Sequence, residues 1–264
     1  MELKNKNIVI TGGGNGIGKA LAERFHAEGA DHIIVADLDI DGARAVATNI
    51  GGRAVECNVT QEDEIKALIE STENDAGPID LFCSNAGISA ARTLDAPDEQ
   101  WRLIIDVNVM AHVYAARHLV PKMIARGGGY FLNTCSAAGL LNQIGGVGYG
   151  MTKHAAVGFG EWIALTYAHQ GIRVSLLCPQ AVRTAMTTGD AMNEAGVAAA
   201  AADGMIEPAQ LAQTTVEGLL EERFLILPHP EVSEYMQRKT SDYDRWIKGM
   251  NRFHRSIYED GTKS

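Results

Sequence analysis

The sequence predicts an α/β fold in which a doubly wound parallel sheet of about seven strands carries helices on both faces, in a single domain of 264 residues. First, short apolar runs alternate with helical patterns along the chain. Second, these runs are continuously apolar, as strands are when helices cover both faces of their sheet. Third, a glycine-rich segment joins the first run to the first helical pattern. Together these features favour parallel strands that are connected by crossover helices.

The expected elements follow one another in alternation. The strands are short runs that are rich in Ile, Val, Leu and Phe, and we expect them at residues 8–10, 33–35, 54–55, 80–83, 130–132, 174–178 and 224–227. We expect helices near residues 17–29, 40–50, 62–76, 99–126, 149–170 and 208–222. In such a sheet, ligands bind beyond the carboxyl ends of the strands.

Two segments stand outside this alternation. Residues 185–206 are rich in Ala, Gly and Met and follow the carboxyl end of a strand, so they form either a mobile substrate lid or a short surface helix. Apolar residues in the tail from 231 to 257 are mostly spaced as in an amphipathic helix. This C-terminal tail is expected to pack on its own domain or on another subunit, with substrate gating as an alternative. Because no linker is visible, residues 1–264 are interpreted as one domain.

The composition narrows the class of function. The net charge is 23 − 33 = −10 with no basic cluster, which argues against nucleic-acid binding. The sequence has no signal-peptide pattern and no apolar run of transmembrane length, so we expect a cytoplasmic protein. The four cysteines are far apart and lie at the downstream ends of apolar runs, which favours buried reduced thiols over disulfides or metal ligands: Cys57, Cys83, Cys135 and Cys178. No metal site is expected.

The segment from Thr11 to Gly18 has the features of a phosphate-binding loop. It contains Gly12, Asn15, Gly16 and Ile17 and lies between the first strand and the first helix. Glycines allow a sharp turn and a close approach of the backbone to a ligand, and the helix N-terminus offers N–H groups to a pyrophosphate. The alternative is a tight turn without a ligand, but the position of the loop favours dinucleotide binding.

Asp37 ends the second expected strand, 19 residues beyond Gly18. A carboxylate at this place accepts hydrogen bonds from an adenosine ribose and repels a 2′-phosphate. Asn15 is neutral and Leu38 follows Asp37, so neither position carries an arginine that would attract that phosphate. We therefore expect NAD rather than NADP, the alternative being that Asp37 is only a solvated residue at a strand end.

Tyr149 and Lys153 are four residues apart in an expected helix, so their side chains lie on one face, one turn apart. A free tyrosine hydroxyl titrates near 10, and roughly 4 kcal/mol of preference for the phenolate would make it a base near pH 7. An ammonium about 4 Å away in a partly shielded site supplies about that much. The pair can therefore transfer protons near neutral pH, although so short a pattern also occurs by chance.

With these residues, the chain resembles the short-chain dehydrogenase/reductase family, in its single-domain branch with a Rossmann-type fold. The resemblance runs from residue 6 to about 185 and is weaker to 227. It depends on several motifs in the family's order. These are Thr11-Gly12-x-x-x-Gly16-Ile17-Gly18, Asn85-Ala86-Gly87, Asn108 in the long helix, Ser136 at 13 residues before Tyr149, the Tyr149/Lys153 pair, and Pro179-x-x-Val182-x-Thr184.

The resemblance implies hydride transfer between a nicotinamide and a carbon that bears a hydroxyl or keto group. Tyr149 would exchange the substrate proton, Lys153 would hold Tyr149 near its phenolate and bind the nicotinamide ribose, and Ser136 would bind the substrate oxygen. Asn108 would support a water through which Lys153 exchanges protons. Asn58 and Val59 would flank the adenine, and Val182 and Thr184 would contact the carboxamide. Family members often form dimers or tetramers through the helices at 99–126 and 149–170, and we expect a homodimer or homotetramer.

Three positions and the tail depart from the family pattern. Asn58 replaces a common Asp, and Ser84 replaces the first Asn of the Asn-Asn-Ala-Gly motif. Gln180 replaces the Gly that usually follows Pro179, which places a side chain either near the nicotinamide end or into the loop. A glycine pair near the last strand is absent from the tail, which puts the usual C-terminal subunit contact in doubt.

We interpret the chain as an NAD-dependent oxidoreductase that acts on a secondary alcohol or ketone, with a moderately hydrophobic small-molecule substrate. The alternatives are a non-catalytic NAD(H)-sensing protein and an NADP-dependent carbonyl reductase. Sugar-nucleotide epimerases and enoyl reductases are disfavoured because their loop or Tyr–Lys spacing differs. The expected pocket wall is mostly small or apolar, and is drawn from residues 88–92, 137–147, Gln180 and 185–206, including Leu140, Leu141, Ile144, Val147, Met186 and Met192.

Overall fold

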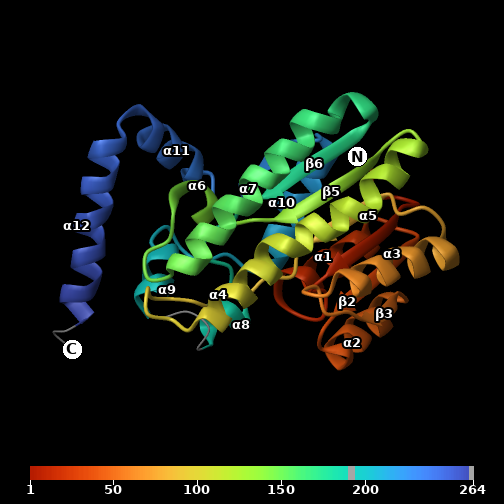
Figure 1. Ribbon diagram of the computed structural model, residues 1–264, viewed down its shortest axis with the longest axis horizontal. Helices are drawn as coiled ribbons and strands as arrows, with labels where there is room; N and C mark the ends of the chain where they lie inside the picture. Colours follow the sequence, from red (N-terminus) through yellow and green to blue (C-terminus); the bar gives the residue numbers. More distant parts are fainter. Residues whose placement is uncertain (190–193, 262–264) are drawn as a thin grey trace.

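The computed structural model describes residues 1–189 and 194–261, and it confirms the predicted fold (Figure 1). Within these residues the chain forms one sheet of seven parallel strands in the order β3-β2-β1-β4-β5-β6-β7. The strands are β1 (Asn7–Thr11), β2 (His32–Asp37), β3 (Arg53–Glu56), β4 (Leu81–Ser84), β5 (Gly129–Thr134), β6 (Ile172–Leu177) and β7 (Leu225–Ile226).

Helices cover both faces of the sheet, as the continuously apolar strands require. The main ones are α1 (Gly16–Ala27), α2 (Ile40–Ile50), α3 (Glu62–Ala76), α4 (Asp98–Ile105), α5 (Ala111–Ala125), α7 (Val147–Tyr167) and α10 (Pro208–Leu220). Successive residues of β1 point to opposite faces: Val9 joins the core under α3, α5 and α7, whereas Ile8 and Ile10 join the core under α1, α2 and α10. All three side chains are fully buried.

The strand order reverses next to β1, which pairs with β2 on one side and with β4 on the other. The crossover connections on the two sides of β1 run in opposite directions, and this leaves a crevice beyond the carboxyl ends of the strands. The glycine-rich loop follows β1 directly, between β1 and α1. The topology therefore places this loop at the position where a doubly wound sheet binds its ligand.

The long helix that was expected at 99–126 is interrupted by a π-helical turn, η1 (Asp106–Met110), between α4 and α5. Periodicity alone did not indicate this turn. It contains Asn108, whose side chain is fully buried. Such turns are rare and are often found at functional sites.

The C-terminal tail forms two helices, α11 (Glu231–Ser241) and α12 (Tyr243–Gly261), where the sequence indicated a single amphipathic segment. Asp242 separates them with an extended backbone, and its carboxylate accepts a hydrogen bond from the Arg245 N–H at 2.9 Å, which caps α12. α11 packs against α6 (Ala138–Leu141), with Val232 fully buried. In Figure 1, α12 stands at the left end of the molecule, beside its main body.

Two short helices, α8 (Ala185–Thr188) and α9 (Glu194–Ala200), lie in the segment that was expected to form a lid. Residues 190–193 of that segment, including Met192, lie outside the described residues. The four cysteines are free and buried, as predicted. Across residues 1–189 and 194–261, no helix is apolar over a length that could traverse a bilayer, and no group of His, Cys, Asp and Glu has the arrangement of a metal site.

Candidate active site

The loop after β1 is a tight turn that only glycine permits at two positions. Gly12 has a φ of +62°, and a Cβ there would lie 2.8 Å from the Ala86 Cα. A Cβ on Gly18 would lie 2.1 Å from the Gly12 carbonyl oxygen, so α1 begins in direct contact with the loop. The Asn15 side chain does not cap α1. The first N–H groups of the helix therefore face the crevice, where they can bind an anion.

Asn85 connects the ends of three strands. Its side-chain amide donates to the main-chain oxygens of Thr11 at 3.0 Å and Gly12 at 3.1 Å, and its Oδ1 accepts from the Thr134 hydroxyl at 2.9 Å. The Thr11 hydroxyl in turn accepts from the main-chain N–H groups of Asn85 at 3.0 Å and Ala86 at 3.2 Å. The Asn85-Ala86-Gly87 motif thus fixes the glycine loop relative to β4 and β5.

Asp37 lies at the carboxyl end of β2, with Leu38 next to it on the rim of the crevice. Its two carboxylate oxygens accept hydrogen bonds from main-chain N–H groups, one from Gly14 at 2.8 Å and the other from Asp39 at 3.0 Å. These contacts hold the carboxylate beside the glycine loop. The charge is therefore fixed at the rim of the crevice, next to the glycine loop.

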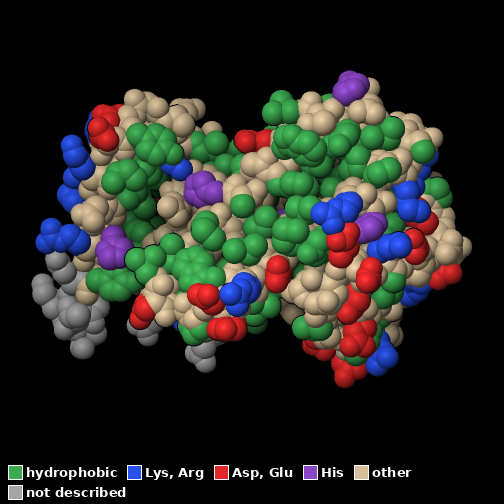
Figure 2. Space-filling view, in the orientation of Figure 1, with side chains coloured by type: hydrophobic (Ala, Val, Ile, Leu, Met, Phe, Trp, Pro, Cys, Tyr) green, Lys and Arg blue, Asp and Glu red, His purple; other side chains and the backbone are tan. Residues whose placement is uncertain are grey.

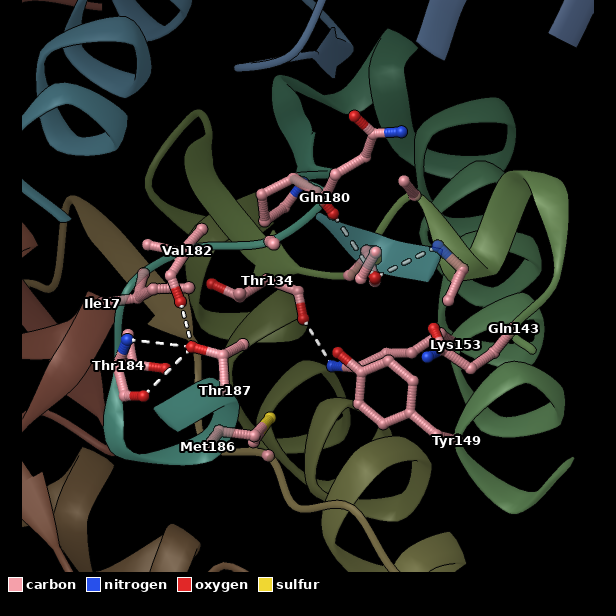
Figure 3. Close-up of a pocket in the computed structure, with 18 of the residues that line it drawn as sticks. Ile17, Thr134, Gln143, Tyr149, Lys153, Gln180, Val182, Thr184, Met186 and Thr187 are labelled. Atoms are coloured by element: carbon pink, nitrogen blue, oxygen red, sulfur yellow. Dashed lines mark hydrogen bonds between the residues drawn. The ribbon is translucent and has the colours of Figure 1, made fainter. Parts of the chain in front are cut away.

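Tyr149 and Lys153 project from the first turns of α7 (Figure 3). Lys153 is only 3% exposed, and its Nζ donates to the carbonyl oxygen of Thr134 at 2.9 Å. The same Nζ lies 5.6 Å from the centre of the Tyr149 ring. The ammonium therefore lies beside the phenol ring, one helical turn away, as the four-residue spacing predicts.

Ser136 lies after β5, two residues beyond Thr134, and is 8% exposed. Its Oγ accepts a hydrogen bond from the Ala138 N–H at 3.1 Å and donates to the Pro179 carbonyl oxygen at 3.4 Å. The second bond is long, so the hydroxyl proton can turn to another acceptor at little cost. Ser136 and Pro179 bring the ends of β5 and β6 together.

Asn108 lies behind the crevice wall and does not line it. Its Oδ1 accepts from the Ile88 N–H at 2.9 Å, and its Nδ2 donates to the Ile88 carbonyl oxygen at 3.0 Å and the Thr152 hydroxyl at 3.1 Å. A Cβ on Gly87 would lie 3.4 Å from the Lys153 Nζ and 3.5 Å from the Asn108 Oδ1. Asn108 thus positions the segment that passes over the Lys153 ammonium.

One turn further along, His112 is 2% exposed, and neither of its ring nitrogens has a hydrogen-bond partner among the described residues. Burial, with a contribution from the nearby Lys153 charge, lowers the His112 pKa to about 3. The imidazole is therefore neutral at physiological pH. The sequence reasoning missed this residue, because a single His within a helix carries no signal of its own.

A cavity of about 680 Å³ extends from the glycine loop past Tyr149. It is lined by every residue predicted for catalysis or cofactor binding except Asn108. These residues are Gly12, Asn15, Gly16, Ile17, Gly18, Asp37, Leu38, Asn58, Val59, Asn85, Ala86, Gly87, Ser136, Tyr149, Lys153, Pro179, Val182 and Thr184. Cys57 also lines it, but burial, with the charges of Glu64 and Asp37, raises its pKa to about 12 and keeps the thiol protonated.

The predicted pocket wall is confirmed in part. Ile88, Leu141, Ile144, Gln180 and Met186 line the cavity. The expectation was wrong for Leu140 and Val147, which do not line it: Leu140 packs against α11, and Val147 is 37% exposed at the start of α7. The structure adds residues of α11 and α12 that were not assigned to the pocket, namely Tyr235, Arg238, Trp246, Met250 and Phe253.

The Gln180 side chain, which follows β6, is linked to Tyr235 of α11 through the carboxylate of Asp203. Its Nε2 donates to Asp203 at 3.0 Å, and the other Asp203 oxygen accepts from the Tyr235 hydroxyl at 2.8 Å. This hydrogen bond to Asp203 raises the Tyr235 pKa. The Gln180 main-chain N–H also donates to the His229 Nδ1 at 3.1 Å. In Figure 3 the Gln180 side chain extends away from Tyr149 and Lys153, so it supports the far side of the cavity.

Comparison with known proteins agrees with this geometry. The family model described as short chain dehydrogenase matches residues 6–195. The chain is 37% identical over 201 residues to a 2,5-dichloro-2,5-cyclohexadiene-1,4-diol dehydrogenase of Sphingobium indicum, covering 74% of this chain and 80% of that protein. It is 35% identical over 190 residues to a cyclohexanol dehydrogenase of an Acinetobacter species, covering 69% and 75%.

A solved structure shows the same architecture. It is a short-chain dehydrogenase/reductase from Burkholderia phymatum in complex with NAD, 27% identical, with a TM-score of 0.83 over 92% of this chain and 96% of that chain. The order of the motifs, the seven-stranded parallel sheet and these matches agree with one another. The chain belongs to the short-chain dehydrogenase/reductase family of oxidoreductases.

Proposed function

We propose that this protein is an NAD-dependent dehydrogenase that transfers hydride between a secondary alcohol or its ketone and nicotinamide. The observation that carries the proposal is that Ser136, Tyr149 and Lys153 line the same cavity as the glycine loop. A hydrogen-bond donor for an oxygen, a proton-transfer group and a dinucleotide-binding turn are the three parts that this chemistry needs.

The residues at the dinucleotide end fit the cofactor. The Gly12–Gly18 contact leaves no room for a side chain, and the uncapped start of α1 supplies N–H groups for a pyrophosphate. Bound nicotinamide supplies the hydride acceptor in oxidation and the hydride donor in reduction. Contacts to the adenine are proposed for Asn58 and Val59, and contacts to the nicotinamide carboxamide for Val182 and Thr184.

Each catalytic side chain has a distinct role in the proposal. Tyr149 accepts the proton of the substrate hydroxyl in oxidation and returns it in reduction. Lys153, held by the Thr134 carbonyl, keeps its positive charge beside Tyr149 and binds the nicotinamide ribose. The Ser136 hydroxyl turns from Pro179 to the substrate oxygen, where negative charge develops. Asn108 positions a water through which Lys153 exchanges protons.

The choice of NAD over NADP is supported by Asp37. Its carboxylate is fixed by the Gly14 and Asp39 N–H groups, so it cannot swing away from a ribose 2′-substituent without losing both bonds. A 2′-phosphate would meet this negative charge, whereas a 2′-hydroxyl can donate a hydrogen bond to it. The neighbouring Leu38, 65% exposed, offers no compensating positive charge.

The proposed substrate is a moderately hydrophobic cyclic secondary alcohol or ketone. Leu141, Ile144 and Met186 line the cavity and are apolar. Two relatives bear names that place the reacting hydroxyl on a six-membered ring, cyclohexanol and a cyclohexadienediol. These names support a carbocyclic substrate for this chain.

The proposal extends to the whole chain, with residues 1–264 acting as one catalytic domain. The buried, unpaired cysteines support a reducing compartment, the cytoplasm. A homodimer or homotetramer is supported by large apolar side chains that α7 leaves in contact with solvent, Trp162 at 53% and Leu165 at 85% exposure.

The test is to incubate the enzyme with NAD⁺, and separately with NADP⁺, against aliphatic, cyclic, aryl and steroid secondary alcohols. Formation of reduced cofactor is followed by absorbance, with Tyr149→Phe as the control. Turnover with NAD⁺ that is lost in the variant is the expected result. Better turnover with NADP⁺ would contradict the role of Asp37, and NAD⁺ binding without turnover of any alcohol would favour a sensor over an enzyme.

A further inference from the structure

Helix α12 turns one apolar side toward the cavity. Trp246, Met250 and Phe253 are spaced by four and three residues, so they share one face of the helix. All three line the cavity that contains Tyr149, although they lie about a hundred positions further along the chain. Figure 2 shows the hollow between α12 and the main body, with hydrophobic side chains around it.

The helix is anchored at its beginning. The preceding helix α11 is fixed by Val232, which is fully buried, and by Lys239, whose Nζ donates to the Leu140 carbonyl oxygen at 2.6 Å. The same Nζ lies 5.4 Å from the centre of the Tyr243 ring, at the first residue of α12. Beyond this point α12 packs against α9, so contacts at two places along the helix support its position beside the cavity.

The charged groups on this side of the cavity are already paired. Asp203 accepts hydrogen bonds from Gln180 and Tyr235. Arg238 donates to Glu234 at 3.2 Å and lies over the Tyr235 ring at 5.5 Å. An apolar substrate group would bury surface against Trp246, Met250 and Phe253, whereas a polar group would lose water there without gaining a hydrogen bond from Met250 or Phe253.

From these contacts we infer that Trp246 and Met250 of α12 form the outer wall of the substrate pocket and select alcohols that carry a second apolar ring beyond the reacting one. The inference rests on the proposed dehydrogenase function, and it adds the part of the substrate that lies far from the reacting carbon. Tyr149 and Ser136 hold the carbinol, and α12 contacts the distal ring.

The test compares cyclohexanol with decahydro-2-naphthol, which has the same carbinol ring and one more ring. Trp246→Ala and Met250→Ala should each lower kcat/KM for the larger alcohol about ten-fold, through KM, because less apolar surface is buried. The value for cyclohexanol, which lacks the second ring, should fall by clearly less. Ile247→Ala is the matched control, because Ile247 is an apolar residue of the same helix that is 57% exposed and does not line the cavity.

Binding of decahydro-2-naphthol to the NADH-loaded enzyme, measured by calorimetry, separates this inference from the proposed function. If the wild type binds decahydro-2-naphthol without turning it over, and Met250→Ala binds it more weakly, the proposed dehydrogenase function is refuted and the role of α12 in the pocket wall is supported. If the wild type turns over both alcohols, and the α12 substitutions leave both rates unchanged or reduce them equally, only the inference about the pocket wall is refuted. If Trp246→Ala loses activity equally toward both alcohols and light scattering shows a changed molar mass, α12 is instead a subunit contact and the inference is overturned.

Discussion

The ammonium of Lys153 donates to the carbonyl oxygen of Thr134 at 2.9 Å, and this bond joins helix α7 to the carboxyl end of strand β5. Both partners are buried, so the bond is shielded from water. It fixes the distance between Tyr149, one turn earlier on α7, and Ser136, two residues beyond Thr134. The Lys153 side chain is thus a structural connection as well as an electrostatic partner of Tyr149.

Replacing Lys153 by Met should therefore lower kcat by about 100-fold or more, because Tyr149 loses its positively charged neighbour and the Thr134 oxygen loses the hydrogen bond from Lys153. Steady-state kinetics with NAD⁺ and the best alcohol checks this. Lys19→Met, at a side chain that is 47% exposed, is the control and should retain wild-type turnover. Wild-type kcat in Lys153→Met would contradict the assigned role.

Gly18→Ala should abolish cofactor binding and destabilise the fold by about 1–3 kcal/mol, because its Cβ would lie 2.1 Å from the Gly12 carbonyl. Calorimetric titration with NADH and urea unfolding are the measurements. Gly158→Ala in α7 is a matched control with nothing within 4 Å of the added Cβ. That variant should be more stable by about 0.5–1 kcal/mol, as Ala is a better helix former. Equal effects at the two glycines would contradict the packing argument.

Asp37→Ser should raise the preference for NADP⁺ over NAD⁺, measured as the ratio of the two kcat/KM values, by at least about ten-fold, since the charge facing the 2′-phosphate is removed. Asp37→Asn separates charge from geometry, because its amide oxygen can still accept from the Gly14 N–H. An unchanged ratio in both variants would show that another residue decides the cofactor.

His112 should make the protein sensitive to mild acid. Its pKa is lowered to about 3 when folded, so the unfolded chain binds a proton first as the pH falls below about 6.5. The free energy of unfolding should therefore decrease by about 2 kcal/mol more in the wild type than in His112→Leu between pH 7 and pH 4.5. Urea titrations across this range check the difference. Parallel pH profiles would mean that His112 has a polar partner when folded.

Leu165→Asp should dissociate the proposed oligomer, because Leu165 is 85% exposed on α7 and a charge there would be buried at a subunit contact. Light scattering gives the mass. Leu94→Asp is the matched control, since Leu94 is 86% exposed in the loop before α4. Dissociation by Leu94→Asp alone, or a wild-type monomer, would contradict the proposed interface.

The sheet, its crossover helices and most of the site could be predicted because their signals are local. Continuous apolar runs, such as those in β1 and β2, indicate burial on both faces of the sheet. The glycines between Gly12 and Gly18 indicate a backbone turn that residues with a side chain rarely adopt. Ser136 and Tyr149 are 13 residues apart in the chain, a separation that one loop and one helical turn bring together.

The parts that were not predicted depend on contacts between distant segments. Nothing near Trp246 or Met250 in the sequence indicates that their helix returns to the strand ends, because an amphipathic pattern specifies a face but not its partner. Val147 and Leu140 were assigned to the pocket from their positions in the chain. In the folded chain neither side chain lines the cavity, and only the three-dimensional packing determines which way they point.

The π-helical turn η1 also sets the rotational phase of everything that follows it in α5. One extra residue in a helix advances the next residues by about 100° around the axis. Asn108 can therefore face Ile88 while Ala115 and Leu119, fully or almost fully buried, still face the core. Deleting a single residue from η1 would restore a regular helix but would rotate that apolar face toward solvent. The position of Asn108 and the packing of α5 can thus change only together.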